Sequence, residues 1–323
     1  MILVYTENTN GKFKKSTYEA LSYAKAIGQK LNVDVAAISF GTTNNDELKN
    51  LAQYGANKIF QVINSKFQSF NGQAYASAIA EAALQNNCNV VVIGNSFSGK
   101  GLAPRVAIKL NAGFVDGAIS LPDTSNGFVV RKGAYSGKAF ADVNVLAATK
   151  VISLVPNSYK VETNPCETNI EEFNPTVKES DFKLTIKETV RAGDKISLPE
   201  AELVVSAGRG LKGPENWGMV EELAGLLGAA TACSKPVSDS HWRPHSEHVG
   251  QTGIAISPNL YIAIGISGAI QHLAGVSSSK TIVVINKDAE APFFKAADYG
   301  IVGDAFEIVP KLIESVKKFK AAI

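Results

Sequence analysis

The chain has 323 residues, of which 45% are apolar and 19% charged, so it can bury a sizeable core, and its length predicts two domains rather than one enlarged core. Its 32 Lys and Arg residues nearly balance 30 Asp and Glu residues, giving a net charge of +2, which excludes a strongly basic nucleic-acid-binding protein. Three widely spaced cysteines without CxxC spacing, Cys88, Cys166 and Cys233, indicate free thiols in a reducing compartment rather than a disulfide framework or a zinc site.

Short apolar strands alternate with helical patterns through the first third of the chain. Ser16 is expected to cap the first helix. Strands are predicted at 2–5, 33–40, 58–62 and 89–94, and helices at 18–27, 48–54, 73–84 and 104–110. This alternation predicts a parallel sheet that is covered by helices on both faces.

The pattern changes after about residue 115. Alternating segments at 128–132 and 150–154 predict that the sheet ends in antiparallel strands. From 156 to 199 the chain is polar and contains four prolines, and 181–189 alternates like an edge strand. We therefore expect an N-terminal α/β domain over 1–190, a linker over 191–202 and a second domain over 203–323.

The second domain restarts the alternation of strands and helices. Strands are predicted at 202–207, 260–264, 281–286 and 299–303, and helices at 217–227 and 309–319. The least polar stretch, 260–276, is too short and too polar to span a membrane. The N-terminus has neither a secretory signal nor a transit-peptide pattern, so a cytoplasmic location is expected.

Gly208-Arg-Gly-Leu-Lys-Gly213 matches a G-x-G-x-x-G loop between a predicted strand and a predicted helix. Such a loop lets a pyrophosphate approach the backbone at a helix N-terminus. The acidic residue that usually binds the ribose is expected at the end of the second strand. Here that stretch, 229–234, ends in Cys233-Ser, just before Lys235, and has no acidic residue. The spacing alone leaves open both a nucleotide site and a turn that merely needs glycine.

The segment from Gly94 to Lys100 nearly matches a P-loop, the phosphate-binding loop of nucleotide triphosphatases. However, Gly101 occupies the position that must hold the Mg²⁺-binding Ser or Thr. A turn followed by the start of a helix is therefore the better interpretation.

His241, His245 and His248, together with Glu247, carry groups that are common metal ligands. Pro244 disfavours a continuous helix that would place them on one face. No metal site is predicted here, and a polar loop close to a cofactor is favoured.

Three segments of the second domain combine small residues with hydrogen-bonding side chains: Val249–Gly253, Ser267–His272, and the stretch beginning at Asn286 just past a predicted strand. Taken singly, each fits a glycine-rich turn or a buried histidine with its hydrogen bonds satisfied. Because ligands bind at the carboxyl ends of parallel strands, the three together favour a shared ligand.

These segments, with 208–212, 261–275, 285–292 and 297–304, closely resemble the electron transfer flavoprotein alpha subunit family. The resemblance covers nearly all of 203–310, and the first half of the chain resembles the family more loosely. It implies an α/β fold with an open, mostly parallel N-terminal sheet domain, nucleotide-α-hydrolase-like, and a C-terminal Rossmann-like FAD-binding domain.

The resemblance also implies a function. The family pairs with a beta subunit as a heterodimer and binds FAD. It shuttles electrons from flavoprotein dehydrogenases, such as the acyl-CoA dehydrogenases of fatty acid beta-oxidation, to a quinone reductase or another acceptor. The chain would then be an electron carrier without substrate chemistry or catalytic residues of its own.

By the same resemblance, Thr252 lies near the flavin N5, His272 at the flavin O2 edge, and Asn286 and Asp304 on the adenosine side. The expected cofactor-binding residues are Arg209, Ser234, Lys235, Val249, Gly250, Gln251, Thr252, Ser267, Gly268, Ala269, Ile270, Gln271, His272, Asn286 and Asp304. A hydrogen-bond donor such as His272 would stabilise the negative charge that reduction places on the flavin.

One departure from the family concerns Lys235, because many members have Arg at this position. Lysine keeps the charge but loses the planar guanidinium that stacks on a ring. We hypothesise that cations of the 241–248 loop, Arg243 among them, partly replace it. The alternatives to the electron carrier are an NAD(P)-dependent oxidoreductase that uses 208–213 as a Rossmann loop and a scaffold without a cofactor.

Overall fold

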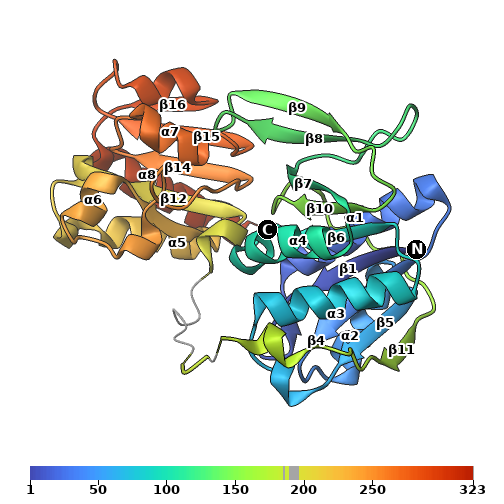
Figure 1. Ribbon diagram of the computed structural model, residues 1–323. Helices are drawn as coiled ribbons and strands as arrows, with labels where there is room; N and C mark the ends of the chain where they lie inside the picture. The colour runs from blue at the N-terminus through green and yellow to red at the C-terminus, as the bar shows by residue number, and fades with distance from the viewer. Residues whose placement is uncertain (185, 189–195, 323) are drawn as a thin grey trace. The chain divides into compact units, whose positions relative to one another are not determined.

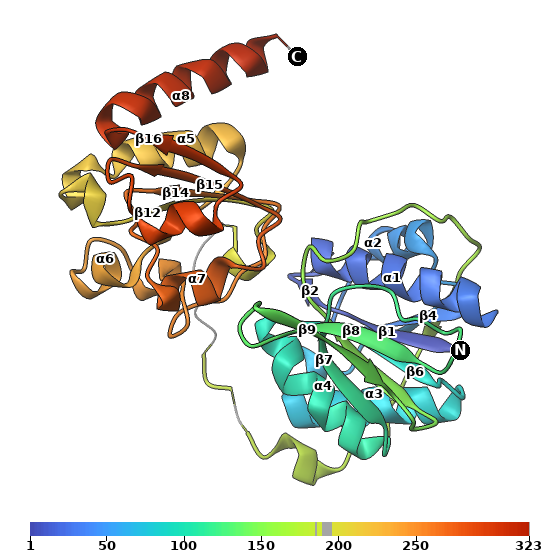
Figure 2. The same ribbon diagram turned by 90° about the horizontal axis from the view of Figure 1, so that it is seen from above.

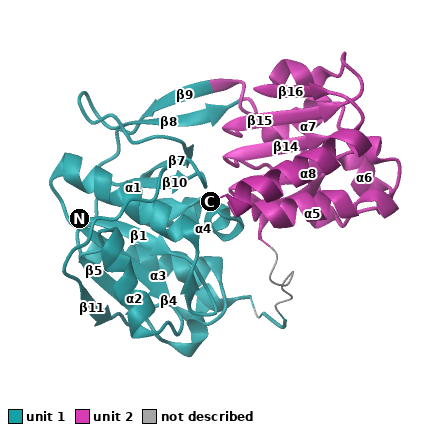
Figure 3. Ribbon diagram, turned by 180° about the vertical axis from the view of Figure 1, so that it is seen from behind, with its two compact units in different colours: residues 1–134, 140–191 teal, residues 135–139, 192–323 magenta. Residues whose placement is uncertain are grey.

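The computed structural model describes residues 1–184, 186–188 and 196–322. The chain divides into two compact units, which Figure 3 shows in different colours. One comprises Met1–Ala134 and Phe140–Arg191, and the other Tyr135–Ala139 and Ala192–Ile323. The first part of the expected linker, 191–195, lies outside the described residues.

The described part of the first unit contains a nine-stranded sheet in the order β11-β5-β4-β1-β6-β10-β7-β8-β9 (Figure 1). Its strands are β1 (Ile2–Thr6), β4 (Val35–Phe40), β5 (Lys58–Val62), β6 (Val90–Gly94), β7 (Gly113–Ala118), β8 (Val129–Ala134), β9 (Ala139–Asn144), β10 (Lys150–Leu154) and β11 (Asn169–Glu172). A short ribbon of β2 (Asn8–Thr9) and β3 (Lys12–Phe13) stands apart from it. Strands β1, β4, β5 and β6 pair in parallel, as expected, and β10 and β11 extend this parallel sheet.

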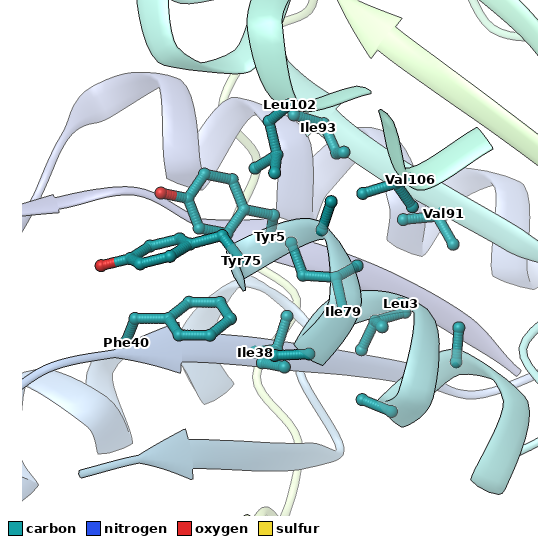
Figure 4. Packing of buried hydrophobic residues seen from close by; sticks show 14 of the residues in the cluster. Leu3, Tyr5, Ile38, Phe40, Tyr75, Ile79, Val91, Ile93, Leu102 and Val106 are labelled. Atoms are coloured by element: carbon teal, nitrogen blue, oxygen red, sulfur yellow. The ribbon is translucent and has the colours of Figure 1, made fainter. Parts of the chain in front are cut away.

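Alternating side chains of these strands feed two cores, one on each face of the sheet. Leu3 and Tyr5 of β1 pack with α3 (Gly72–Gln85) and α4 (Phe97–Lys109) on one face, as Figure 4 shows. Ile2 and Val4 pack on the other face with α1 (Lys15–Leu31) and α2 (Asn45–Asn50). This two-sided burial explains why the strands read as continuous apolar runs.

Three local predictions for the first unit are wrong. Helix α1 begins at Lys15, so Ser16 lies inside it and is not its N-cap. The segment 150–154 forms β10, which pairs in parallel with β6 and β7 inside the sheet, whereas the segment 128–132 overlaps β8, which pairs antiparallel with β7 as expected. Within 181–189 the described residues form no strand, since η3 (Glu179–Phe182) is a 3₁₀ helix, and the edge strand is β11.

The second unit contains a five-stranded parallel sheet in the order β13-β12-β14-β15-β16. Its strands are β12 (Leu203–Ala207), β13 (Ala230–Cys233), β14 (Leu260–Ile264), β15 (Thr281–Asn286) and β16 (Tyr299–Val302), and its helices are α5 (Gly218–Leu227), α6 (Lys235–Asp239), α7 (Ile270–Val276) and α8 (Ala305–Ala321). Figure 2 shows α5 and α8 on one face of the sheet and α7 on the other.

Numbered within this unit, the strand order is 2-1-3-4-5, which is a doubly wound order. In such a sheet the chain leaves β12 toward one edge and returns at β14 toward the other. The carboxyl ends of β12 and β14 therefore flank the point where ligands bind in open α/β sheets. No helix in the described part of the chain is long and apolar enough to cross a membrane.

Candidate functional site

A cavity of about 830 Å³ lies at the carboxyl ends of four strands of the second unit. Gly208 follows β12, Ser234 follows β13, Gly265 follows β14, and Asn286 ends β15, and all four line the cavity. Its remaining walls come from α6, the segment 248–252 and the N-terminal part of α7. The volume falls in the range of about 300–1,000 Å³ that is common for small-molecule sites.

Most of the sequence-predicted site residues meet at this cavity although they are spread over about 80 positions of the chain. Those that line it are Arg209, Ser234, Lys235, Val249, Gly250, Gln251, Thr252, Ser267, Ala269, Gln271, His272 and Asn286. Gly268, Ile270 and Asp304 do not line it. Ile270 is 59% exposed, and the Asp304 carboxylate caps α8 by accepting the backbone N–H of Phe306 at 2.9 Å.

His272 is held in the cavity wall with one ring nitrogen left over. Its side chain is buried, and Nε2 lies 2.8 Å from the hydroxyl of Tyr261. Nδ1 has no hydrogen-bond partner among the described residues. If the tyrosine hydroxyl donates to Nε2, the neutral imidazole carries its proton on Nδ1 and offers it as a donor.

Both groups of this pair remain uncharged near neutral pH. Burial lowers the pKa of His272 to about 4, His248 adds a smaller effect in the same direction, and the backbone of Val249 opposes both. Burial also raises the pKa of Tyr261. A buried neutral donor that is already oriented suits an acceptor atom on which negative charge develops.

Glycines bring the loops after β12 and β14 into direct backbone contact. The N–H of Gly210 donates to the carbonyl of Gly265 at 3.1 Å. A Cβ added to Gly210 would lie 2.7 Å from the Cα of Gly265. The close packing of the two loops therefore requires glycine here. This packing explains the G-x-G pattern at 208–210.

The loop after β12 differs from a dinucleotide-binding turn. Two 3₁₀ turns, η5 (Arg209–Leu211) and η6 (Pro214–Asn216), follow the strand, and α5 starts only at Gly218. Gly213 therefore leads into a short 3₁₀ turn and not directly into the N-terminus of an α-helix. The phosphate-on-helix geometry expected from the literal G-x-G-x-x-G match is absent from this described loop.

The cavity also has lining residues that the sequence prediction did not include in the site. They are Gly208, Gly210, Pro236, Asp239, Ser240, His248, Gly265, Ile266 and Asp288. Gly265, Ile266 and Asp288 lie within two residues of the ends of predicted strands. The rule that ligands bind at the carboxyl ends of parallel strands could therefore have identified them. Pro236, Asp239 and Ser240 gave no such signal, because no helix was predicted at α6.

Lys235 and Arg243 have different surroundings. Lys235 lines the cavity, and its side-chain ammonium has no hydrogen bond or ion pair with the described residues. Arg243 does not line the cavity: its Nε and Nη2 each donate to Glu247 at 2.7 Å, and its Nη1 donates to Glu221 at 2.8 Å. The guanidinium also lies 5.4 Å from the ring centre of Trp217. These contacts do not support the hypothesis that Arg243 supplies a cation to the cofactor.

The other sequence motifs resolve as follows. Ser96 caps α4 by accepting the N–H of Gly99 at 3.0 Å, so the P-loop-like segment is a turn and a helix start, as interpreted. Among the described residues, no group of three or more His, Cys, Asp and Glu side chains is arranged to hold a metal ion.

Comparison with known proteins agrees with this geometry. Residues 2–178 match the family model of the electron transfer flavoprotein domain, and 197–277 match that of the electron transfer flavoprotein FAD-binding domain. Electron transfer flavoprotein subunit alpha of Thermoanaerobacterium thermosaccharolyticum is 37% identical over 99% of this chain and 98% of its own length. Those of Syntrophomonas wolfei and Bacillus subtilis are 38% and 35% identical, over 98% of this chain and 98% and 97% of their own lengths. The chain belongs to the electron transfer flavoprotein alpha subunit family.

Proposed function

We propose that the chain holds FAD in the cavity of its second unit and carries electrons rather than transforming a substrate. The observation that carries this proposal is the cavity itself, which lies at strand ends and takes most of its lining from the part of the chain that matches an FAD-binding domain. Its wall presents an unpartnered ring nitrogen of His272 and the unpaired cation of Lys235. These are the complements that an acceptor-rich, anionic cofactor requires.

When bound, FAD supplies the reversible uptake and release of one or two electrons. His272 would orient an acceptor edge of the ring through Nδ1, because Tyr261 fixes the other side of the imidazole. Lys235 would balance negative charge from the α6 side of the cavity. Thr252 and Gln251 would provide further hydrogen-bonding groups.

The remaining proposed contacts follow the lining of the cavity. Arg209, Ser234, Val249, Gly250, Ser267, Ala269, Gln271 and Asn286 are proposed as further FAD-binding residues. The side chain of Asn286 already donates to the carbonyl of Ile266 at 3.0 Å and accepts from Asp288 at 3.1 Å, so it also holds two wall segments together. Gly268, Ile270 and Asp304 stay predictions that the cavity lining does not support.

We extend the proposal to the whole protein as follows. The chain pairs with an electron transfer flavoprotein beta subunit, and its N-terminal domain (1–190) contributes to that pairing. The segment 191–202 links this domain to a second domain that is Rossmann-like in the broad, doubly wound sense. Flavoprotein dehydrogenases, such as acyl-CoA dehydrogenases, deliver the electrons, and a quinone reductase or another acceptor receives them. The three free cysteines suit a cytoplasmic setting.

The NAD(P)-dependent alternative is not favoured. It needs a helix starting at the end of the glycine loop and an acidic residue after the second strand. Instead, α5 begins five positions after Gly213, and Ser234 and Lys235 follow β13.

The test is to purify the chain together with its partner subunit and to analyse the bound cofactor. A yellow complex that releases FAD on denaturation, in a ratio near one per cavity, is expected. The paired variant His272→Ala with Lys235→Ala should retain the partner but hold less FAD. A colourless complex that takes up no added FAD would contradict the proposal.

A further inference from the structure

The cavity wall contains a second buried imidazole, that of His248, to which the family resemblance gives no role. His248 is 2% exposed and lines the cavity next to Val249. Its Nδ1 has no hydrogen-bond partner among the described residues, and no hydrogen bond joins its Nε2 to any of them either. A buried polar ring without a protein partner loses its bonds to water unless a ligand or solvent in the cavity replaces them.

The backbone holds this ring firmly in place. The carbonyl of His248 accepts the N–H of Ile254 at 2.8 Å, and the residue forms a β-bridge with Cys233 at the end of β13. A Cβ at Gly253 would lie 2.8 Å from Nδ1, so glycine at that position leaves room for the imidazole. The ring is thus a fixed part of the wall and not a surface side chain that happens to fold inward.

The charge environment of His248 favours the neutral form. Burial lowers its pKa, as do the neighbouring His245 and Lys235, while the carboxylate of Asp239 opposes this effect. The titratable groups next to His248 are Lys235 and Asp239 of α6, His245 and Glu247 of η7 (His245–Glu247), His272 of α7 and Cys233 of β13, and Arg209 and Asp288 line the same cavity. A neutral imidazole with an unpaired nitrogen can accept a proton when negative charge is added nearby.

We propose that His248 takes up a proton from solvent when the cofactor in the cavity is reduced, and that it returns the proton on reoxidation. The inference rests on the proposed function. A flavoprotein dehydrogenase supplies two electrons, and the reduced cofactor takes one proton. His248 takes a further proton on the ring nitrogen that is unprotonated in the neutral imidazole. The only bond formed in the protein is that N–H bond, and the added positive charge offsets the negative charge that has entered the cavity.

The first test measures how the midpoint potential of the bound FAD depends on pH in the purified complex. Around neutral pH, the wild-type complex should take up one more proton per two electrons than the variant His248→Gln does. His241→Gln is the matched control, because His241 is exposed, lies in the same loop and does not line this cavity. Equal pH dependence in the wild type and His248→Gln, with FAD bound to both, would overturn the inference.

A second measurement does not depend on the folding of that variant. In the wild-type complex with ¹⁵N-labelled histidine, the His248 ring should be neutral in the oxidised protein and protonated in the reduced protein at pH 7. With the label in this chain only, the His248 signal is identified as the one that persists in each of the three single variants His241→Gln, His245→Gln and His272→Gln. A ring that stays neutral in both states would overturn the inference alone, whereas a wild-type complex without FAD would contradict the proposed function as well.

Discussion

Arg243 shows how a cation near a binding loop can serve the stability of the fold instead of the cofactor. Its guanidinium binds both carboxylate oxygens of Glu247, whose side chain is 8% exposed, and also reaches Glu221, which is 51% exposed. Planar, bidentate geometry of this kind is specific to arginine. The clamp fixes the 241–248 loop just before the segment that lines the cavity.

Replacing this residue should cost stability and leave the cofactor's potential almost unchanged. Arg243→Met removes the arginine from a buried carboxylate, so we expect the free energy of unfolding to fall by about 3 kcal/mol. Glu221→Gln, at the exposed end of the same clamp, should cost less than about 1 kcal/mol. Thermal unfolding measures the loss of stability in each variant, and a redox titration measures the potential of the cofactor. A shifted potential at unchanged stability would instead show that Arg243 acts on the flavin.

At the scale of elements, the site depends on the close approach of two loops that follow neighbouring parallel strands. The loop after β12 and the loop after β14 touch through Gly210 and Gly265, with backbone bonded to backbone. Since both loops line the cavity, the distance between them sets the shape of the cavity on this side. A single methyl group at this contact has to push the loops apart.

Gly210→Ala should therefore weaken FAD binding at least tenfold and lower the thermal midpoint. The matched control is Gly225→Ala within α5, where a Cβ would meet nothing within 4 Å. Alanine in a helix interior is favoured over glycine by roughly 0.5–1 kcal/mol, so the control should be slightly stabilised. Fluorescence titration with FAD compares the two. Wild-type affinity in Gly210→Ala would show that the loops can separate without affecting the site.

The elements that sequence patterns predicted well are those whose local signal needs no neighbour. β5 and β14 have the expected bounds because apolar runs ended by polar residues define them. The position of β10 between β6 and β7 could not be predicted, since a strand's pattern does not name its partners. The predicted start of helix α4 lay too late in the chain, because Gly99 and Gly101 are poor helix formers. Helix α6, which contains Pro236, was not predicted.

Most residues of the predicted site line one cavity. Segments 249–252 and 267–272 were found because their polar groups stand out in apolar surroundings, and the structure brings both to one cavity. The role of His248 as part of the wall could not be predicted, because nothing local distinguishes it from His241 and His245. Its burial comes from the β-bridge to Cys233, which is a long-range contact.

At the scale of the whole molecule, all of the cavity's lining belongs to the second unit. The first unit has separate cores on both faces of its own sheet. Because ligand binding stabilises only the cooperative unit that contains the site, FAD should act on one unit and not on the other. This division gives a direct test of both the domain boundary and the site.

The two tryptophans of the chain, Trp217 and Trp242, both lie in the second unit, so tryptophan fluorescence of the isolated chain reports the unfolding of that unit. FAD at 100 times its dissociation constant should stabilise the unit by about 2.7 kcal/mol. The fluorescence midpoint should rise, while a separate transition of the first unit, followed by circular dichroism, stays in place. Because Gly210→Ala weakens the proposed site, it should show a smaller rise at the same FAD concentration. An unmoved fluorescence midpoint in the wild type would place the cofactor outside the cavity described above.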